Sequence, residues 1–375
     1  MRSLQALAIL VITALLVLAT AASGAQALLP PHFWGAVPQG GLTEAQLQRL
    51  RHGGVDAIRI PVSWPTVQPS PGGDLQWGGI DAWVEAAARA RLEVLPFLYD
   101  APDWAVHSAP VPGTHGAARA PAHLPIRGRA GREWARFVRA AADRYGTRGS
   151  FWLENPLLPR MPIHDWQIWN EENFKYFVAR PNPGEYGRLV RRSEHALRAG
   201  DPRAELLLGG LFARPAEARY RVRPPQAYTA ADFLRLMYRR TPGITSRFDG
   251  IALHPYAGDH ESLRPEIEET RTVLREAGDA GKALWITEMG WSSQHPSRRD
   301  AFAKGWRGQA RQLRGAFRLL RSNQRRWHLR QVYWFSVTDE ADTCNFCGGS
   351  GLFGARFHPK PAWHAYVHFT GGRVG

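Results

Sequence analysis

The sequence predicts a (β/α)8 barrel, a fold in which eight parallel strands alternate with helices and close into a ring. Three observations support this prediction. Short apolar segments alternate with amphipathic helical segments, which is typical of parallel strands joined by helices. Eight such strand segments can be counted, and a chain of 375 residues has the length of one barrel with insertions. No internal repeat or linker divides the chain, so we expect a single domain.

The predicted strands are short runs rich in branched and aromatic residues. They span residues 32–37, 56–61, 93–99, 165–169, 206–211, 248–254, 283–288 and 331–337. The predicted helices carry their apolar residues on one face. They span residues 80–90, 131–145, 185–199, 231–239 and 264–277, with one from 43 to 53, one ending near 320 and an eighth around 362–368. Thr43 and Gln46 have the spacing of a capping box, and Gly200 is expected to end the helix before it.

An open, doubly wound sheet is the alternative fold, because its strands and helices alternate along the chain in the same way. Such a sheet usually binds its ligand at a glycine-rich turn after the first strand, and no such turn follows Val37. The long connections leave the C-terminal ends of strands, where barrel enzymes hold their active sites. These connections span residues 101–130, 212–230, 292–299 and 338–361.

The first 27 residues have the pattern of a secretion signal. Arg2 gives a positive start, residues 4–20 are almost wholly apolar, and Ala25-Gln26-Ala27 is an A-x-A cleavage signature. An uncleaved anchor is the alternative, because residues 4–22 are nearly long enough to span a bilayer. We expect residues 1–27 to be a signal peptide, and residues 28–375 to be a catalytic domain that is secreted or associated with the cell envelope.

The chain is strongly basic, with a formal net charge of +15, and all but four of its 48 basic residues are arginine. Six of the arginines form one regular stripe. The favoured explanation is a helix face exposed to solvent, and the alternative is a surface that binds an anionic cell-envelope polymer. Nucleic acid is not expected, because no recognition motif accompanies the charge. We expect a monomer. The stripe has three- and four-residue spacing and comprises Arg307, Arg311, Arg314, Arg318, Arg321 and Arg325.

The chain has two cysteines, Cys344 and Cys347. In an exported protein, a disulfide that closes a glycine-rich loop is the favoured interpretation. A zinc site would need a second cysteine pair, which the sequence lacks. No His or Asp cluster has convincing metal-ligand spacing, so neither a metal nor a cofactor is predicted.

Two of the predicted strands end in glutamate. The fourth reads Asp165-Trp-Gln-Ile-Trp-Asn170-Glu171, and the seventh reads Ala283-Leu-Trp-Ile-Thr-Glu288. A carboxylate at the end of a buried strand is unfavourable unless it is paired or faces a solvent-filled site. Parallel strands bring their C-terminal ends to one rim, and glycoside hydrolysis needs two carboxyl groups there. The sequence therefore predicts a glycosidase.

These strand ends also resemble a known group of enzymes. The segment from Trp166 to Glu171 is similar to the W-x-x-W-N-E motif that ends strand four in clan A glycoside hydrolases. The segment from Ile286 to Trp291 resembles the strand-seven nucleophile motif of the same clan. The similarity covers most of the barrel and is greatest to family 39 and related bacterial exopolysaccharide hydrolases. It implies a retaining enzyme on a (β/α)8 barrel.

The resemblance implies a role for each matching residue. Glu171 would be the acid/base, and Glu288 would be the nucleophile. The predicted substrate-binding residues are Arg59, Asn170, His254, Tyr256, Trp291 and Trp334. Among these, Arg59 and Tyr256 would support the nucleophile, Asn170 would bind the sugar 2-hydroxyl, and Trp334 would floor the subsite of the cleaved sugar. Many relatives have proline after the acid/base, where this chain has Glu172, so Glu172 is the alternative acid/base.

Each of these residues also has a purely structural interpretation. Arg59 could neutralise a buried charge, His254 could be a satisfied core histidine, and the tryptophans could be packing residues. A carbohydrate-binding barrel without turnover is accordingly the alternative function. The presence of both glutamates favours an enzyme that cleaves O-glycosidic bonds of a polysaccharide or oligosaccharide. An esterase is not expected, because no G-x-S-x-G nucleophile elbow is present.

Overall fold

The computed structural model describes residues 29–106, 122–213, 222–339 and 347–374. Residues from His32 onwards form one compact unit, to which residues 29–31 do not belong. In this unit each of the strands β1 to β7 pairs in parallel with the next along the chain, and β8 pairs with β1. The sheet is therefore a closed barrel, as predicted, and not an open sheet. Its strands are β1 (Trp34–Val37), β2 (Ala57–Ser63), β3 (Glu93–Tyr99), β4 (Asp165–Asn170), β5 (Glu205–Phe212), β6 (Gly250–His254), β7 (Ala283–Met289) and β8 (Leu329–Phe335).

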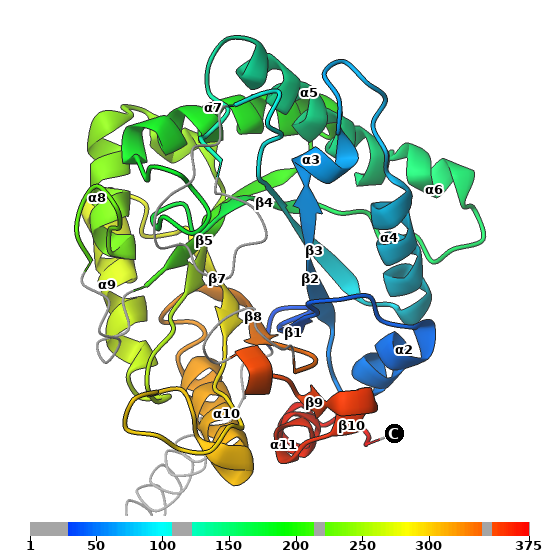
Figure 1. Cartoon of the computed structure of the whole chain (residues 1–375), viewed down its shortest axis with the longest axis vertical. Helices are drawn as coiled ribbons and strands as arrows, with labels where there is room; N and C mark the ends of the chain where they lie inside the picture. The colour runs from blue at the N-terminus through cyan, green and yellow to red at the C-terminus, as the bar shows by residue number, and fades with distance from the viewer. Residues whose placement is uncertain (1–28, 107–121, 214–221, 340–346, 375) are drawn as a thin grey trace, which may run out of the picture. The chain divides into compact units, whose positions relative to one another are not determined.

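Helices lie around the strands (Figure 1). The long ones follow the strands in the predicted order, and the eighth predicted helix is confirmed as α11. The helices are α2 (Glu44–His52), α3 (Trp64–Val67), α4 (Gly78–Ala90), α5 (Gly128–Tyr145), α6 (Ser150–Glu154), α7 (Pro183–Gly200), α8 (Ala230–Arg240), α9 (Leu263–Glu276), α10 (Gly305–Ser322) and α11 (Pro361–Thr370). The sequence did not predict α3 and α6, because four or five residues are too few to show helical periodicity. A small antiparallel pair, β9 (Phe353–Gly354) and β10 (His358–Pro359), was also not predicted.

Local sequence signals explain where most helices begin and end. The capping box predicted for α2 is present, with the Thr43 side chain and the Gln46 side chain each bonded to the other residue's backbone N–H. Helix α7 ends at Gly200, as predicted, and Asp201 is its C-cap. Gly200 also allows close packing, since a Cβ there would lie 2.6 Å from the Arg139 carbonyl oxygen of α5.

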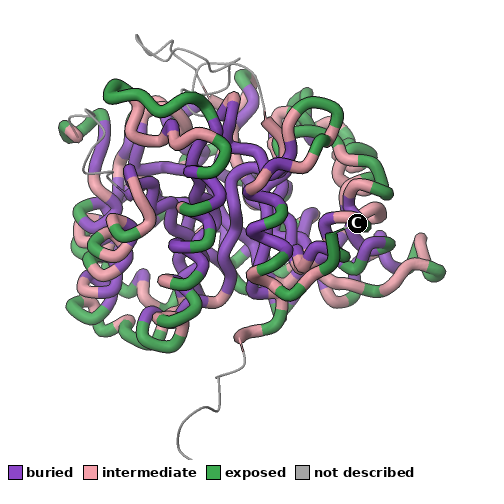
Figure 2. The backbone as a smooth tube through the Cα atoms, turned by 90° about the horizontal axis from the view of Figure 1, so that it is seen from below, coloured by how far each residue is buried: buried purple, intermediate pink, exposed green. Residues whose placement is uncertain are grey.

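The barrel strands are buried, and the exposed residues lie on the surrounding helices and connections (Figure 2). Side chains from opposite strands fill the interior, among them Leu95, Leu207, Trp285 and Tyr333. This packed interior supports the rim from below and leaves the C-terminal ends of the strands as the place for a site. Within the described residues, no helix combines the length and the apolar character needed to cross a membrane.

Candidate active site

Arg59 lies in the middle of β2 and is buried inside the barrel. Its Nη1 donates to Glu288 Oε1 at 2.6 Å, and its Nη2 donates to Asn170 Oδ1 at 2.6 Å. Its Nε donates to Gln167 Oε1 at 2.9 Å, and the guanidinium lies 4.0 Å from the centroid of the Phe97 ring. A buried cation is tolerated only with such partners, so Arg59 fixes the side chains around it.

Glu288, near the end of β7, is held at both carboxylate oxygens. Its Oε1 accepts from Arg59, and its Oε2 accepts from the Tyr256 hydroxyl at 2.7 Å. Burial, followed by the charge of Glu288, raises the pKa of Tyr256 well above its usual value, so the hydroxyl stays a donor. Two short hydrogen bonds, one of them from a cation, therefore hold this carboxyl group in one position.

Glu171 follows β4 and meets His254 at the end of β6. His254 Nδ1 lies 2.8 Å from Glu171 Oε1, and its Nε2 lies 3.0 Å from Thr287 Oγ1. Burial, followed by the charge of Arg59, holds the pKa of His254 well below its usual value, so the ring is neutral. A ring that donates from Nδ1 to Glu171 and accepts at Nε2 from Thr287 satisfies each of these contacts. Gly210 gives it room, because a Cβ there would lie 2.0 Å from Nε2.

The backbone at the end of β4 departs from a regular strand. Consecutive residues of a strand point to opposite faces, yet Asn170 and Glu171 both reach the site. Trp169 and Glu171 have φ angles of 71° and 44°, in the left-handed region that residues other than glycine rarely adopt. This conformation lets two successive polar side chains enter the mouth of the barrel.

The two glutamates lie close together in unequal environments. One carboxylate oxygen of Glu171 lies within 4.8 Å of one of Glu288. Burial, followed by the negative charge of Glu288, raises the pKa of Glu171 well above its usual value, and Arg59 only partly opposes this. Glu288, in contrast, is paired directly with Arg59. The environment of Glu171 therefore favours its protonated form, whereas the carboxyl group of Glu288 is held by a cation and a hydroxyl donor.

Glu171, His254 and Glu288 also have ligand atoms close enough together to hold a metal ion. The guanidinium of Arg59, 2.6 Å from Glu288, opposes a second cation at this point. His254 Nε2, moreover, already contacts Thr287. The contacts favour an acid–base site over a metal centre.

The structure contradicts the prediction that Trp291 and Trp334 face a sugar. Both side chains are 0% exposed, and their rings pack against each other with centroids 6.0 Å apart. Their indole nitrogens donate to backbone carbonyls, Trp291 to Ala257 and Trp334 to Ser350. Neither ring offers a free face to a ligand, so the two tryptophans form a packing pair.

Phe335, the residue after Trp334, occupies the position that had been assigned to that tryptophan. Side chains alternate along β8, so Tyr333 and Phe335 point into the barrel while Trp334 points outward. Phe335 is the last residue of the strand, is 8% exposed, and has its ring centroid 6.3 Å from that of Tyr256. The prediction therefore missed the inward-facing aromatic residue by one position.

The structure brings six of the eight predicted site residues together, and two further polar residues contact them. Gln167 and Thr287 were not predicted. A polar residue inside an otherwise apolar strand was the available signal for each of them. The six residues that meet at the barrel mouth are Arg59, Asn170, Glu171, His254, Tyr256 and Glu288.

Glu172, the alternative acid/base, is 0% exposed, whereas Glu171 retains some exposure at the mouth. Its carboxyl group lies against β5 and α7, so close to Gly209 that a Cβ there would lie 2.2 Å from Oε2. Within the described residues neither of its oxygens makes a hydrogen bond of normal geometry, although the Tyr186 hydroxyl, which donates to the Ile168 carbonyl, lies near enough to lower the pKa of Glu172 in part. Burial raises the pKa of Glu172 to about 8. This environment favours Glu171, not Glu172, as the carboxyl group that reacts.

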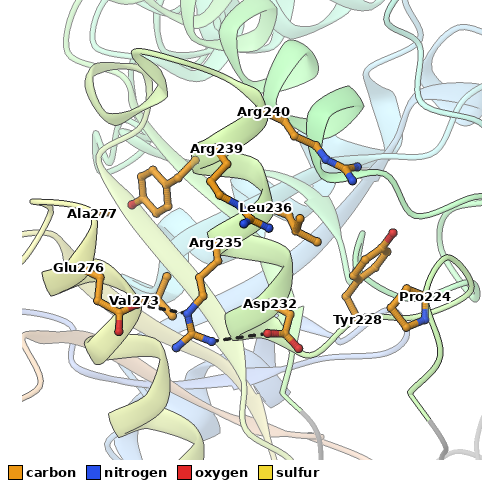
Figure 3. A pocket seen from close by; sticks show the side chains of 11 residues that line it. Pro224, Tyr228, Asp232, Arg235, Leu236, Arg239, Arg240, Val273, Glu276 and Ala277 are labelled. Carbon is orange, nitrogen blue, oxygen red and sulfur yellow. Dashed lines mark hydrogen bonds and ion pairs between the residues drawn. The ribbon is translucent and has the colours of Figure 1, made fainter.

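A separate surface pocket of about 550 Å³ lies between α8 and α9 (Figure 3). Arg235 is one of the residues that line this pocket, and it forms ion pairs with Asp232 and Glu276. None of the predicted site residues lines this pocket. It is distinct from the carboxyl pair at the barrel mouth.

The fold resemblance predicted from the motifs is confirmed by solved structures. A family 39 glycoside hydrolase from Bacteroides cellulosilyticus WH2 has a TM-score of 0.63 and 18% sequence identity, over 91% of this chain and 64% of that chain. A monomeric beta-xylosidase from Caulobacter crescentus CB15 has a TM-score of 0.63 and 16% identity, over 92% of this chain and 69% of that chain. This chain therefore spans about two thirds of the length of these proteins.

A shorter protein shares the fold over nearly its whole length. The intracellular xylanase of Thermoanaerobacterium saccharolyticum JW/SL-YS485, solved in complex with xylotriose, has a TM-score of 0.57 and 14% identity, over 90% of this chain and 95% of that chain. No protein-family model matches the sequence, and no curated protein is similar to it. At these identities the comparisons show a shared fold, the closed (β/α)8 barrel.

The buried carboxyl group of Glu172 predicts a pH-dependent loss of stability. Its folded-state pKa of about 8 lies above the ordinary value of 4.5, so between these values the folded protein holds a proton that the unfolded chain has released. The free energy of unfolding should therefore fall as pH rises from about 4.5 to 8, by an amount on the order of a few kcal/mol, and should level off above. Glu172→Gln abolishes this titration.

The measurement is denaturant unfolding of wild type and Glu172→Gln from pH 4.5 to 9. The stability of the variant relative to wild type should increase with pH, whatever constant offset the buried amide introduces. Glu44→Gln, on the exposed surface of α2, provides the baseline. A difference between wild type and Glu172→Gln that does not change with pH would show that Glu172 is ionised in the folded protein throughout.

Proposed function

We propose that this chain is a retaining glycoside hydrolase that cleaves O-glycosidic bonds of a polysaccharide or oligosaccharide. The observation that carries the proposal is the meeting of Glu171 and Glu288 within 4.8 Å in unequal environments. Retaining enzymes hold their carboxyl groups about 5–5.5 Å apart, whereas inverting enzymes leave room for a water molecule at about 6.5–9.5 Å. The short separation supports double displacement.

In the first step Glu288 attacks the anomeric carbon as Glu171 protonates the glycosidic oxygen. The bond between carbon and oxygen breaks, the leaving group departs as an alcohol, and the sugar is bound to Glu288 as an ester. His254 donates to Oε1 of Glu171, which leaves Oε2 to carry the proton toward the leaving group. Asn170, fixed by Arg59, is placed to bind the sugar 2-hydroxyl.

In the second step Glu171 acts as a base. The charge of Glu288 helps to raise the pKa of Glu171 in the free site, and this charge disappears once the ester forms. The pKa of Glu171 then falls, so it gives up its proton and can accept another from water. The water oxygen attacks the anomeric carbon, and Glu288 departs as a carboxylate into its bonds with Arg59 and Tyr256.

The names of the structural neighbours suggest the first substrates to try. They include a beta-xylosidase, a glucosidase and a xylanase solved with xylotriose. We propose aryl xylosides, aryl glucosides and xylo-oligosaccharides as the first panel. A carbohydrate-binding barrel without turnover would bind such sugars and release no product.

Replacement of the two glutamates tests the mechanism. Glu288→Ala should lower kcat on the order of 10⁴-fold or more on every substrate, because no other group can form the ester. Azide should restore turnover with inversion at the anomeric carbon. Glu171→Ala should affect poor leaving groups most, and azide should then give a product of retained configuration. Product stereochemistry by NMR distinguishes the two roles.

Two results would contradict the assignment. If Glu172→Ala, and not Glu171→Ala, shows retained-configuration azide rescue, the acid/base is Glu172. If both single variants retain wild-type turnover, the carboxyl pair does not carry the reaction. Thermal unfolding of each variant checks that lost activity is not lost folding.

Phe335 is proposed as the aromatic floor of the subsite that holds the cleaved sugar. Phe335→Ala should lower kcat/KM about tenfold or more, because it removes a face on which the sugar can stack. Phe335→Tyr should keep most of the activity. Trp334→Phe is the matched control and should lower the Tm with little change in kcat/KM, since Trp334 is a buried packing residue. The opposite pattern would restore Trp334 as the stacking residue.

We also propose that the chain is exported, cleaved after Ala27 and closed by a Cys344–Cys347 disulfide. Residues 1–28 and Cys344 lie outside the described residues, so this proposal rests on the sequence. Mass spectrometry of secreted protein should give a chain that begins at Leu28, and thiol titration of unfolded, unreduced protein should find no free thiol. The protein should elute as a monomer. Two titratable thiols would contradict the disulfide.

A further inference from the structure

The positive charge of the chain is concentrated in one segment. Residues 298–326 contain ten arginines or lysines and a single acidic residue, Asp300. This segment therefore carries most of the formal net charge of +15 in less than a tenth of the chain. A compositional preference for arginine would spread the excess evenly, so the segment needs a local explanation.

Helix α10 provides most of this charge, and it differs from the other arginine-bearing helices. Those α-helices all contain acidic residues, and several pair with an arginine of the same helix, as in Arg89–Glu85 of α4, Arg139–Asp143 of α5 and Arg264–Glu268 of α9. Helix α10 contains no acidic residue at all. Like charges at this spacing repel one another and destabilise a helix slightly, which an anionic partner would relieve.

Five arginines of α10 and one just beyond it form a continuous surface, here called the basic strip. All six are exposed, and no ion pair links them to a carboxylate in the described parts of the chain. Their spacing places the five helical members within about 80° of the helix circumference, at intervals of about 5 Å along the axis. The basic strip consists of Arg307, Arg311, Arg314, Arg318, Arg321 and Arg325.

The basic strip begins at the rim of the barrel that holds the carboxyl pair. Helix α10 follows the connection after β7, and the ring of Phe302 in that connection packs 6.2 Å from the ring of Tyr256, which binds Glu288. The backbone N–H of Lys304 donates to Ser292, close behind Glu288 in the chain. Trp306 starts the helix and is 52% exposed, the one exposed tryptophan of the described residues.

We propose that the basic strip binds an anionic polysaccharide, one that carries carboxylate or sulfate groups along its length, and leads it to the mouth of the barrel. This inference rests on the proposed function and names the substrate class of the same site. Guanidinium groups bind carboxylates and sulfates through paired hydrogen bonds, and an exposed indole provides a face for a sugar ring.

The structure favours a glycan over other polyanions. A lipid surface would require apolar side chains that can insert, but those of α10, such as Leu313, Phe317 and Leu320, are buried against the barrel. Binding of a single-stranded nucleic acid would use several exposed aromatic residues for stacking, and the strip has only Trp306 beside it. A linear glycan needs only a charged track and a stacking face near the site.

The test compares binding of polygalacturonate with binding of its fully methyl-esterified form, which has the same backbone without the charges. Isothermal titration calorimetry at about 150 mM salt should detect binding of polygalacturonate and no binding of the methyl-esterified form. Arg311→Glu/Arg314→Glu/Arg318→Glu should weaken binding of polygalacturonate about tenfold or more. Arg132→Glu/Arg136→Glu/Arg139→Glu on α5 is the control, because it changes the net charge equally at exposed positions of the same spacing. Trp306→Ala should weaken binding a few-fold.

Each other result would overturn the inference. Equal weakening by the α10 and α5 variants would mean that only the net charge matters. Tighter binding of DNA or of phosphatidylserine vesicles than of polygalacturonate would assign the strip to that partner. Absence of binding would leave it a solvated face. Hydrolysis of an aryl glycoside is measured separately. Turnover without binding of polygalacturonate would contradict the proposed role of the basic strip. Binding without turnover would contradict the proposed function.

Discussion

The site depends on a single buried cation. The Arg59 guanidinium contacts Glu288, Asn170 and Gln167 at the same time and stacks on Phe97. Because water is excluded from it, each of these contacts is strong and each partner is held in one position. Arg59 lies on β2 and its partners lie on β3, β4 and β7, so one side chain positions much of the barrel mouth.

The same cation makes the two glutamates unequal. Glu288 receives the direct ion pair, while Glu171 receives a neutral histidine and the repulsion of its neighbour. In equal environments the two carboxyl groups would share one proton, and neither would be assigned to the acid step or to the nucleophilic step. The chemistry proposed for the site follows from this asymmetry more than from the presence of two glutamates.

Much of this arrangement could be predicted from the sequence, because parallel strands bring their ends to a common rim. Glu171 and Glu288 end predicted strands, and no long-range information was needed to expect that they meet. The choice between Trp334 and Phe335 could not be made in the same way. Both are apolar and adjacent, and only the register of β8 decides which one faces inward. Nor could the sequence show that Glu172 is buried, since this depends on the space left by a glycine in the next strand.

The ion pair between Arg59 and Glu288 also bears on how the chain folds. The two residues are separated by 229 positions, so the pair joins the first quarter of the barrel to its last. If either strand were missing from the folded barrel, the other charge would lose its partner, and a buried charge without a partner is strongly unfavourable. The contact that completes the reactive site therefore also ties the two ends of the ring together, so the site is complete only in the closed barrel.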